Sequence, residues 1–380
     1  MVHSFTIIGG GIAGLTTAIA LKRIGIDAMV IEATPEFRPV GAGLSLAANA
    51  MQAFREIGIA DAVIAAGKNM AALTIFDQKG RVINRTNTER VNAKYGISNF
   101  SIHRAALHNV LYSYLSPERV IKGKRSCGIE QLNEGWRVFF EDGSNIESTF
   151  LIVAEGIHSP IRKIVAPASK LRYAGYTCWR GIVQNERQIV SFSETWGTKG
   201  RFGIVPLADN QIYWFATKSV KEPASALKDF GKADLANNFR GYHEPVVDLI
   251  SATPDQHIIW NDIFDLEPIN RYAYGNLVLV GDAAHATTPN LGQGACMAIE
   301  DAVVLANCLK KNSKVPEAFE RFQAKRLKRT HDIVNGSWQM GKIAQVEDPL
   351  VSNIRNAFFR LIPQFVYEKQ IDDLFNVNFD

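Results

Sequence analysis

Cysteine is scarce in this sequence, and the few cysteines present form no metal-binding pattern. Cys127, Cys178, Cys296 and Cys308 show no C-x-x-C spacing and no interleaved histidines. We therefore expect no metal site and no disulfide framework. Cysteine usage of this kind is typical of a reducing compartment, which favours a cytoplasmic protein.

Long hydrophobic runs are also lacking. No stretch approaches the roughly 18 uninterrupted apolar residues that a membrane-spanning helix requires. The run from Phe5 to Leu21 is apolar enough to resemble a signal peptide, but no Lys or Arg precedes it and it contains four glycines. A strand, a turn and a helix explain this run better.

A strong charge imbalance is absent as well. The net charge is only +4, and the one concentrated group of basic residues lies at 325–329. We interpret that group as a solvated helix face and expect no nucleic-acid binding. With 380 residues, of which 47% are apolar, the chain exceeds the usual size of a single core, so two structural units are predicted.

The beginning of the chain matches the βαβ dinucleotide fingerprint. A short apolar strand enters a glycine turn, continues as a helix over 15–24 and returns as a strand over 28–32. The glycines permit a tight turn, close approach of a pyrophosphate and close packing of helix on strand, and the final carboxylate can bind an adenosine ribose. The residues that we expect to contact the dinucleotide are Gly9, Gly11, Ala13, Gly14 and Glu32. The fingerprint alone does not distinguish NAD from FAD.

The rest of the pattern predicts an α/β protein: a Rossmann-like parallel sheet with a β-meander, an inserted and mostly antiparallel β-sheet, and C-terminal helices. The expected elements are a helix over 49–57, a hairpin over 72–87, a helix over 101–111 capped by Ser101, a meander over 124–131, 136–141 and 146–153, an antiparallel sheet over 171–265 that includes a helix over 224–240, a strand over 277–280 and a helix over 294–309.

A glycine-rich loop over 280–294 indicates which cofactor binds. It reads Val-Gly-Asp-Ala-Ala-His-Ala-Thr-Thr-Pro-Asn-Leu-Gly-Gln-Gly. This loop resembles the G-D motif of class A flavoprotein monooxygenases of the p-hydroxybenzoate hydroxylase type. The whole chain is similar to that family, and in particular to its urate- and salicylate-hydroxylase-like branch.

The resemblance implies FAD as the cofactor. It implies that Asp282 binds the ribityl chain and that the start of the following helix faces the flavin, where backbone N–H groups favour the negative charge of the reduced ring. Arg104, in the first turn of its helix, is expected near an anion such as a phosphate. The other residues implied to lie at the flavin are Arg38, Gly41, Gly43, Pro289, Gly292, Gln293 and Gly294.

The resemblance also implies how the chain is divided. We expect an FAD-binding domain over 1–70, 101–168 and 268–345, a substrate domain over 71–100 and 169–267, and a C-terminal helical segment over 346–380. The apolar residues of Ile354 to Phe375 are expected to pack against the body rather than to associate with a membrane. A monomer and a homodimer both remain open.

The middle motif departs from the family. The family's usual Asp-Gly is Glu155-Gly156 here, followed by Arg162. These three residues are expected at the NAD(P)H and FAD site, with Arg162 orienting the nicotinamide. The chain has no second G-x-G-x-x-G. That absence favours transient use of NADH or NADPH at the flavin rather than a separate NAD(P)H domain.

The implied reaction is hydroxylation of a small aromatic or heteroaromatic substrate with O2 and NAD(P)H, through a flavin C4a-hydroperoxide. Arg201 and Tyr213, on neighbouring β-runs, are the expected substrate contacts, and Pro289 is placed beside the reaction centre. Weaker candidates for substrate contact are Tyr176, Trp179 and Arg180. For His285 we expect a structural hydrogen bond rather than a general-base role.

Four other functions are weighed against this one. An isoprenoid reductase or an epoxidase shares the first and last motifs, and a reductase would incorporate no oxygen. A flavin halogenase is disfavoured because the sequence contains no W-x-W-x-I-P motif. A non-enzymatic flavin redox sensor would turn over NAD(P)H only slowly, and no sequence feature favours it.

Overall fold

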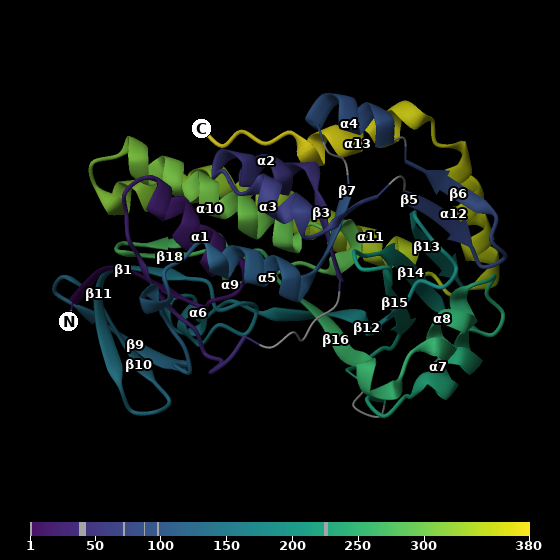
Figure 1. Cartoon of the computed structure of the whole chain (residues 1–380), viewed down its shortest axis with the longest axis horizontal. Coiled ribbons are helices and arrows are strands. Elements are labelled where there is room, and N and C mark those ends of the chain that lie inside the picture. The colour runs from purple at the N-terminus through teal and green to yellow at the C-terminus, as the bar shows by residue number, and fades with distance from the viewer. Residues whose placement is uncertain (1, 38–42, 71–72, 87, 97–98, 224–226) are drawn as a thin grey trace.

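The computed structural model describes residues 2–37, 43–70, 73–86, 88–96, 99–223 and 227–380. Three sheets organise the described chain (Figure 1). The largest has eight strands in the order β17-β18-β11-β1-β2-β8, and β10 and β9 extend it from β11. Its strands are β1 (Val2–Ile8), β2 (Met29–Ile31), β8 (Val120–Ile121), β9 (Ser126–Leu132), β10 (Gly135–Phe140), β11 (Asn145–Val153), β17 (Ala273–Tyr274) and β18 (Leu277–Leu279).

The pairing of these strands confirms the predicted Rossmann-like sheet. β1 is parallel to both β2 and β11, and β11 is parallel to β18. The expected meander is confirmed by the antiparallel pairing of β10 with β9 and with β11. Parallel pairing brings the carboxyl ends of β1, β11 and β18 to one edge of the sheet, which is where ligands bind in such folds.

Helices cover one face of this sheet. In Figure 1, α1 (Ile12–Arg23), α2 (Ala48–Glu56) and α10 (Gly294–Lys311) lie on one side of the strands, while β9, β10 and α6 (Pro160–Val165) lie on the other. α1 packs against α10, α5 and the sheet. Its residues from Gly14 to Leu21 are all buried, as expected for a helix that is apolar on nearly every side.

The second sheet has seven strands in the order β16-β12-β15-β14-β13-β5-β6. They are β5 (Leu73–Asp77), β6 (Val82–Arg85), β12 (Leu171–Gln184), β13 (Phe192–Gly197), β14 (Gly200–Pro206), β15 (Gln211–Ser219) and β16 (Ile259–Leu266). The predicted hairpin is confirmed as β5 and β6, and β5 joins the sheet by parallel pairing with β13. The predicted antiparallel pairing of β14 with β15 is also confirmed.

Two helices cover one face of the second sheet. α7 (Lys232–Phe239) is shorter than the helix expected over 224–240, and α8 (Val246–Ala252) was not predicted. They enclose a hydrophobic core that includes Trp179, Phe202 and Trp214. The sheets follow the expected division of the chain, although the domain boundaries themselves stay a prediction.

The third sheet has three strands in the order β3-β7-β4. It contains β3 (Gly43–Ala47), β4 (Lys68–Asn69) and β7 (Asn99–His103), and α3 (Ala60–Ala65), α4 (Thr88–Tyr95) and α5 (Arg104–Ser113) accompany it. The predicted cap at Ser101 is wrong, because Ser101 belongs to β7 and its hydroxyl donates to the Pro206 carbonyl at 2.5 Å. The N-cap is His103, whose Nδ1 accepts from the Ala105 N–H at 3.1 Å.

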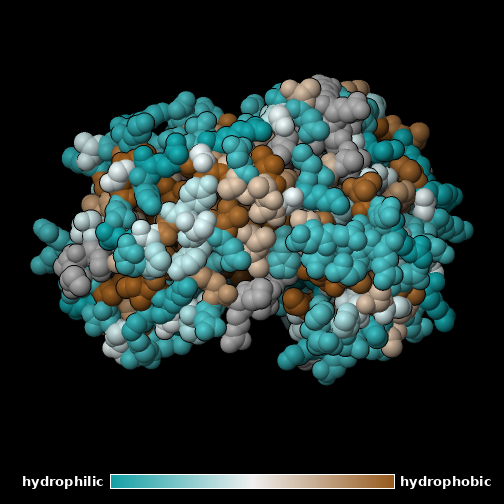
Figure 2. Space-filling view, viewed as in Figure 1, coloured by the Kyte–Doolittle hydropathy of each residue, from teal (hydrophilic) through white to brown (hydrophobic). Residues whose placement is uncertain are grey.

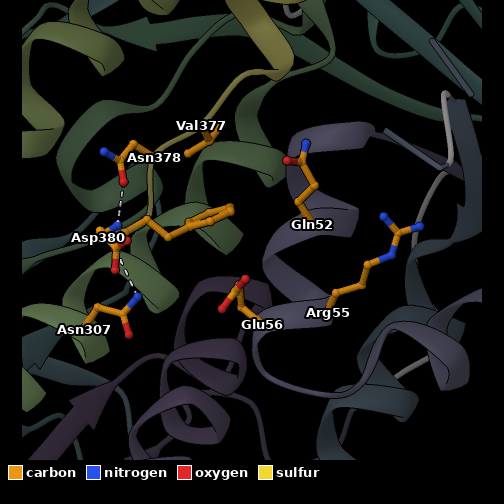
Figure 3. Close-up of a pocket in the computed structure, with 8 residues that line it drawn as sticks. Gln52, Arg55, Glu56, Asn307, Val377, Asn378 and Asp380 are labelled. Atoms are coloured by element: carbon orange, nitrogen blue, oxygen red, sulfur yellow. Dashed lines mark hydrogen bonds between the residues drawn. The ribbon is translucent and has the colours of Figure 1, made fainter. Parts of the chain in front are cut away.

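The chain ends in α11 (Val315–Ala344), α12 (Pro349–Leu361) and α13 (Gln364–Phe375). The last residues pack on α2 and α10: the Gln52 amide donates to the Phe375 carbonyl and the Asn307 amide to the Phe379 carbonyl, both at 3.0 Å. Figure 3 shows the pocket of about 420 Å³ that this tail forms with α2 and Asn307. Among the described residues, no helix is both long and apolar enough to cross a membrane.

The basic group at 325–329 differs from its prediction. Lys328 is solvated, but the Arg326 side chain is only 2% exposed and the Arg329 side chain 19% exposed. Both arginines point inward from α11 toward carboxylates on α10. The periodicity of α11 explains the error, since residues three apart lie on the same face of a helix.

Candidate active site

The glycine turn after β1 forms an open anion site at the start of α1. Gly9 has a φ of +109°, and a Cβ on Gly14 would collide with the Gly9 carbonyl oxygen. The N-cap Gly11 provides no side-chain hydrogen bond, so no side chain caps the first N–H groups of α1. A Cβ placed on Gly11 would meet nothing within 4 Å. This geometry fits a pyrophosphate resting on the helix N-terminus.

Glu32 is held in place by the same turn. Its Oε2 accepts from the Gly10 N–H at 2.7 Å, and its Oε1 accepts from the Thr34 N–H at 2.7 Å and the Thr34 hydroxyl at 2.8 Å. A carboxylate offers about four acceptor positions, so one remains for a ribose hydroxyl. Nε2 of His108, on α5, lies 2.8 Å from the Gly10 carbonyl. The sequence analysis did not single out His108, which belongs to no motif.

The G-D loop begins where β18 ends. Gly281 is followed by α9 (Asp282–His285), η4 (Pro289–Leu291) and then α10. Asp282 is exposed, yet burial among protein atoms raises its pKa, with Arg104 and His285 among the cations that oppose this effect. Both properties fit a carboxylate that lines a recess open to solvent. Arg104 begins α5 and is exposed, so its expected place near an anion stays a prediction.

The start of α10 has the potential expected for a flavin site. Its N-cap residue Gln293 forms no side-chain cap, and no acidic residue lies in the first turn, so the positive end of the helix dipole is not neutralised there. Gly292 has a φ of +63°, and a Cβ on it would meet nothing within 4 Å. Pro289 and Gly292 are exposed. Gly294 and Gln293 lie at the helix start, as predicted.

These segments converge although they are distant in sequence. The Gly9 N–H donates to the Ile31 carbonyl and the Ala154 N–H to the Ile8 carbonyl, both at 2.7 Å. A Cβ on Gly281 would come within 2.8 Å of the Cβ of Ala13. The glycine turn, the middle motif and the G-D loop therefore share one edge of the sheet. The open positions along that edge fit an extended dinucleotide.

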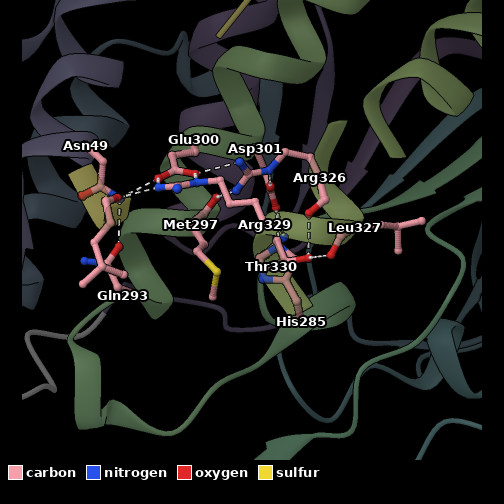
Figure 4. Close-up of polar contacts among 12 residues, drawn as sticks. Asn49, His285, Gln293, Met297, Glu300, Asp301, Arg326, Leu327, Arg329 and Thr330 are labelled. Carbon is pink, nitrogen blue, oxygen red and sulfur yellow. Dashed lines mark hydrogen bonds and ion pairs between the residues drawn. The ribbon is translucent and has the colours of Figure 1, made fainter. Parts of the chain in front are cut away.

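A buried charge network supports the G-D loop from below (Figure 4). Arg326 bonds Glu300 and Asp301, both at 2.7 Å, and Arg329 bonds Glu300 at 2.7 Å. Burial alone would raise the pKa of each carboxyl, but Arg326 and Arg329 outweigh it at Glu300, and His285 and Arg326 do so at Asp301. Both pKa values lie below the ordinary range, so both groups are ionised at neutral pH.

The same network holds both ends of the G-D loop. Asp301 Oδ2 accepts from the Gly281 N–H at 2.8 Å and lies 2.7 Å from Nε2 of His285. The Asn49 amide bridges Glu300 and the Gln293 side chain. The predicted structural hydrogen bond of His285 is thereby confirmed. The sequence analysis missed Glu300 and Asp301 because two adjacent acids in a helix match no motif.

The middle motif is held by its own neighbours. Glu155 accepts hydrogen bonds from the hydroxyls of Ser126 and Ser159 and from the Ile161 N–H, and burial raises its pKa. Arg162 is 1% exposed and donates to the carbonyls of Ile157 and Ala283. The expected role of Arg162 in orienting the nicotinamide stays a prediction, and it requires this enclosed side chain to become accessible. A Cβ on Gly156 would meet nothing within 4 Å, which leaves space beside the motif.

Tyr213 lies where the second sheet meets β3. A Cβ on Gly43 would come within 2.8 Å of the Tyr213 ring. Burial raises the pKa of Tyr213, and the cationic Arg180, which shares its face of the sheet, opposes this effect in part. Around it lie Met70, Val205 and Leu207, with Ile182, Phe192 and Phe215 packed against them. We call this set of seven residues the apolar roof.

Arg201 lies in an internal network between the sheets. Its guanidinium bonds Glu194 at 3.0 Å, Asn290 at 2.6 Å and Gln345 at 3.3 Å, and its side chain is 4% exposed. Asn290, in η4, also accepts from the Tyr176 hydroxyl at 3.0 Å. Arg201 therefore links the second sheet to the G-D loop. Its expected contact with substrate stays a prediction that requires this network to open.

Two of the weaker substrate candidates, Trp179 and Arg180, lie on opposite faces of the second sheet. Trp179 is buried in the core under α7 and α8, so its expected substrate contact is wrong. Arg180, the next residue in β12, points to the opposite face with Tyr213. Two residues expected at the flavin, Arg38 and Gly41, lie outside the described residues.

Comparisons with known proteins agree with this geometry. The model of the FAD binding domain family matches residues 3–337. The chain belongs to this family. It is 38% identical to an aurachin C monooxygenase/isomerase of Stigmatella aurantiaca over 94% of this chain and 93% of that protein. It is 33% identical to a 2-heptyl-3-hydroxy-4(1H)-quinolone synthase of Pseudomonas aeruginosa over 93% of both chains.

A solved structure has the same architecture. Klebsiella pneumoniae HpxO complexed with FAD and uric acid matches with a TM-score of 0.91 at 29% identity, covering 98% of this chain and 96% of that one. The predicted fold class and the predicted membership of the class A flavoprotein monooxygenases are confirmed. The protein is an FAD-dependent monooxygenase, and its open helix N-termini and glycine positions fit FAD.

Proposed function

We propose that this monooxygenase uses NAD(P)H and dioxygen to hydroxylate a heteroaromatic ring that has an apolar substituent. The observation that carries the proposal is the apolar roof, because all seven of its side chains are aliphatic, aromatic or thioether. A ring with several exposed oxygens and nitrogens would leave polar atoms unpaired against such a surface. An alkyl or alkenyl chain would be desolvated there.

The names of two relatives support this substrate class. One is an aurachin C monooxygenase/isomerase, and the other is named for a quinolone with a heptyl group. The uric acid complex of HpxO supports a second candidate, a small polar heterocycle. Arg180, which shares the face of Tyr213, is a cation that an anionic ring could approach.

FAD, when bound, accepts a hydride from NAD(P)H and activates dioxygen, which is the chemistry of this family. The chain's own residues position and tune that chemistry. The uncapped start of α10 would stabilise negative charge on a reduced cofactor held beside it. Tyr213 keeps its proton at neutral pH, because burial raises its pKa, and its hydroxyl can donate to a ring oxygen or nitrogen of the substrate.

The apolar roof also excludes water from the reacting ring. Val205 and Leu207 are both 1% exposed, so this cluster offers no polar group and no solvent path at these positions. No dedicated base is assigned, since the sequence and the described site contain no carboxylate next to Tyr213. We place this reaction in the cytoplasm, where NAD(P)H is available.

A panel of ring compounds tests the proposal. Substrate-stimulated NAD(P)H oxidation is measured for 4-quinolones with 2-methyl to 2-heptyl groups, for urate and for 4-hydroxybenzoate, and isotopic dioxygen reports incorporation into the product. We expect kcat/KM to rise by up to roughly fourfold for each methylene added to the alkyl group, until the group covers the apolar roof. Tighter coupling with urate than with every alkylquinolone would overturn the assignment, and absence of labelled product would exclude monooxygenation.

A further inference from the structure

Helix α12 has its polar side chains inside and most of its apolar side chains outside, so the predicted packing of the apolar residues of Ile354 to Phe375 against the body is wrong for this face. The inward residues Ser352, Arg355 and Asn356 are 4%, 7% and 5% exposed. The outward residues are Leu350 (70% exposed), Val351 (48%), Ile354 (61%), Phe358 (62%) and Leu361 (81%), and Phe365 (68%) follows at the start of α13. A surface helix ordinarily shows the reverse arrangement. Figure 2 shows hydrophobic residues at the upper right, near the junction of α12 and α13.

Buried contacts fix this orientation. Arg355 donates to the carbonyls of Ile343 and Ala344 at 3.1 and 3.0 Å, and its guanidinium lies 5.0 Å from the Trp196 ring centre. Phe359 packs edge-on against Trp196 at 5.3 Å. Rolling the helix to bury its apolar face would expose Phe359 and remove the partners of a buried cation. The outward face is therefore held outward by the fold.

The outward face has the spacing of a two-helix seam. Leu350, Ile354, Ala357 and Leu361 are all exposed, and they follow one another at intervals of four, three and four residues. This is the a/d spacing of a coiled coil. The series reads the same in both directions about the midpoint between Arg355 and Asn356. An antiparallel copy of α12 would thus place Leu350 opposite Leu361 of the partner subunit, and Ile354 opposite Ala357 of the partner subunit.

Charge and size both favour a second copy. The exposed acids Glu347 and Asp348 precede α12, and Arg360, whose guanidinium also bonds Asp77 at 2.8 Å, lies at its other end. An antiparallel pair brings the acidic start of each helix to the Arg360 end of the other and opposes the two helix dipoles. A lipid surface with anionic headgroups would instead repel the acidic end. Six large side chains at this exposure amount to an apolar patch well above the few hundred Å² usual for a monomer and near the roughly 800 Å² per partner of a standard interface.

We propose that the protein forms a two-fold homodimer through antiparallel packing of α12 on α12 of a second copy. Such an interface is isologous and closes on itself, so assembly stops at the dimer. Ala357 at the centre of the seam is small enough to let the two helices approach closely. The dimer requires no change in the FAD site and does not depend on the substrate class.

Light scattering of the full-length, FAD-loaded protein across a concentration series tests the assembly. We expect a dimer, and we expect Ile354→Glu to raise the dissociation constant by on the order of 30-fold or more, because it places a charge at the centre of the seam. Val190→Glu is the matched control, since Val190 is 59% exposed but lies in the connection between β12 and β13. FAD content and circular dichroism report whether each variant folds. A monomeric wild-type protein at all concentrations would overturn the proposal.

Cysteine pairing tests the register. In a Cys127→Ser background, which removes the exposed native thiol, Leu350→Cys and Leu361→Cys are made as separate proteins and mixed. Only the mixture is expected to form disulfide-linked dimers, because two copies of residue 350 would be about 16 Å apart at 1.5 Å per residue, beyond the reach of a disulfide. Equal cross-linking of either single variant with itself would overturn the antiparallel register. A monomer that floats with anionic vesicles would overturn the dimer and assign the face to lipid.

Discussion

At the scale of single residues, Glu155 shows how a motif residue acquires a structural role. Its carboxylate accepts hydrogen bonds from two serines and one backbone N–H, and Arg162 lies close enough to lower its pKa in part. Burial nevertheless dominates and raises the pKa above its usual value. The Glu155 side chain, one methylene longer than the family's Asp, thus contacts residues of its own motif and the neighbouring strand. Ionised Glu155 therefore costs stability at neutral pH.

This cost predicts a pH dependence for Glu155→Gln. A raised pKa in the folded state means that the folded protein binds the proton more tightly, so the wild type loses stability relative to the variant as pH rises from about 4.5 through the folded pKa. Urea unfolding of both proteins between pH 4.5 and 8 measures the difference. We expect the free energy of unfolding of the wild type minus that of Glu155→Gln to fall with pH. A difference that stays flat or rises with pH would contradict the assignment of burial as the cause.

At the scale of elements, α10 and α11 act as one support for the cofactor loop. Four charged side chains are enclosed between them, and each carboxylate oxygen of Glu300 and Asp301 accepts at least one hydrogen bond. Because Asp301 also accepts from the Gly281 N–H, the loop that begins the G-D motif is positioned by the helix that follows it. Rigidity at the flavin edge thus comes from buried ion pairs rather than from loop sequence alone.

Removing one of these charges should destabilise the fold strongly. Asp301→Asn leaves Arg326 without one buried counter-charge, and we expect a loss of roughly 3–5 kcal/mol in the free energy of unfolding. The matched control is Asp332→Asn on α11, whose Lys328 partner is 87% exposed, and there we expect at most about 1 kcal/mol. Urea denaturation followed by circular dichroism compares them.

The loss of folding stability at low pH, here called the acid limb, provides a second readout for the same variant. The pKa values of Glu300 and Asp301 are lowered in the folded state, so their stabilisation is complete above the unfolded pKa values near 4 and is lost as pH falls through the folded ones. Asp301→Asn should therefore flatten the acid limb. Equal stability losses in Asp301→Asn and Asp332→Asn would contradict the view that the network supports the fold.

At the scale of the whole molecule, two contacts of different kinds help to join the second sheet to the cofactor edge. Arg201 and Asn290 connect β14 to η4, and Tyr213 lies against Gly43 in β3. The first contact is polar and the second is steric, and they involve different strands of the sheet. The position of the apolar roof relative to β3 therefore depends on the close approach of the Gly43 backbone to the Tyr213 ring.

A single methyl group at Gly43 tests this dependence. In Gly43→Ala the added carbon would lie 2.8 Å from the Tyr213 ring, whereas in the control Gly128→Ala it would meet Phe139 at 3.8 Å, an ordinary contact. We expect Gly43→Ala to retain FAD but to lose roughly ten- to hundredfold in substrate-stimulated NAD(P)H oxidation, because the roof is displaced. Bound FAD is quantified by absorbance after denaturation. Wild-type turnover in Gly43→Ala would show that Tyr213 does not position the substrate.

The sequence by itself determined the fold class, the cofactor and the local elements near glycine motifs. These features depend on short-range constraints: a glycine where a side chain would collide, as at Gly14, and a period of apolar residues that selects strand or helix. The β5–β6 hairpin, the meander and the buried β18 were predicted on the same basis. Errors arose where a tertiary contact replaced a local preference, as at Ser101, whose hydroxyl bonds Pro206 instead of capping α5.

Only the tertiary structure decided which charged and aromatic side chains face the site. Arg326 and Lys328 are two residues apart, yet one is enclosed and the other is solvated, because the helix turns one toward Glu300 and the other away. Trp179 and Arg180 are divided between core and roof by the alternation of β12. The inverted polarity of α12 depends on the buried partners of Arg355, which lie on other elements. Such contacts join residues that are distant in the chain, so no local pattern contains them.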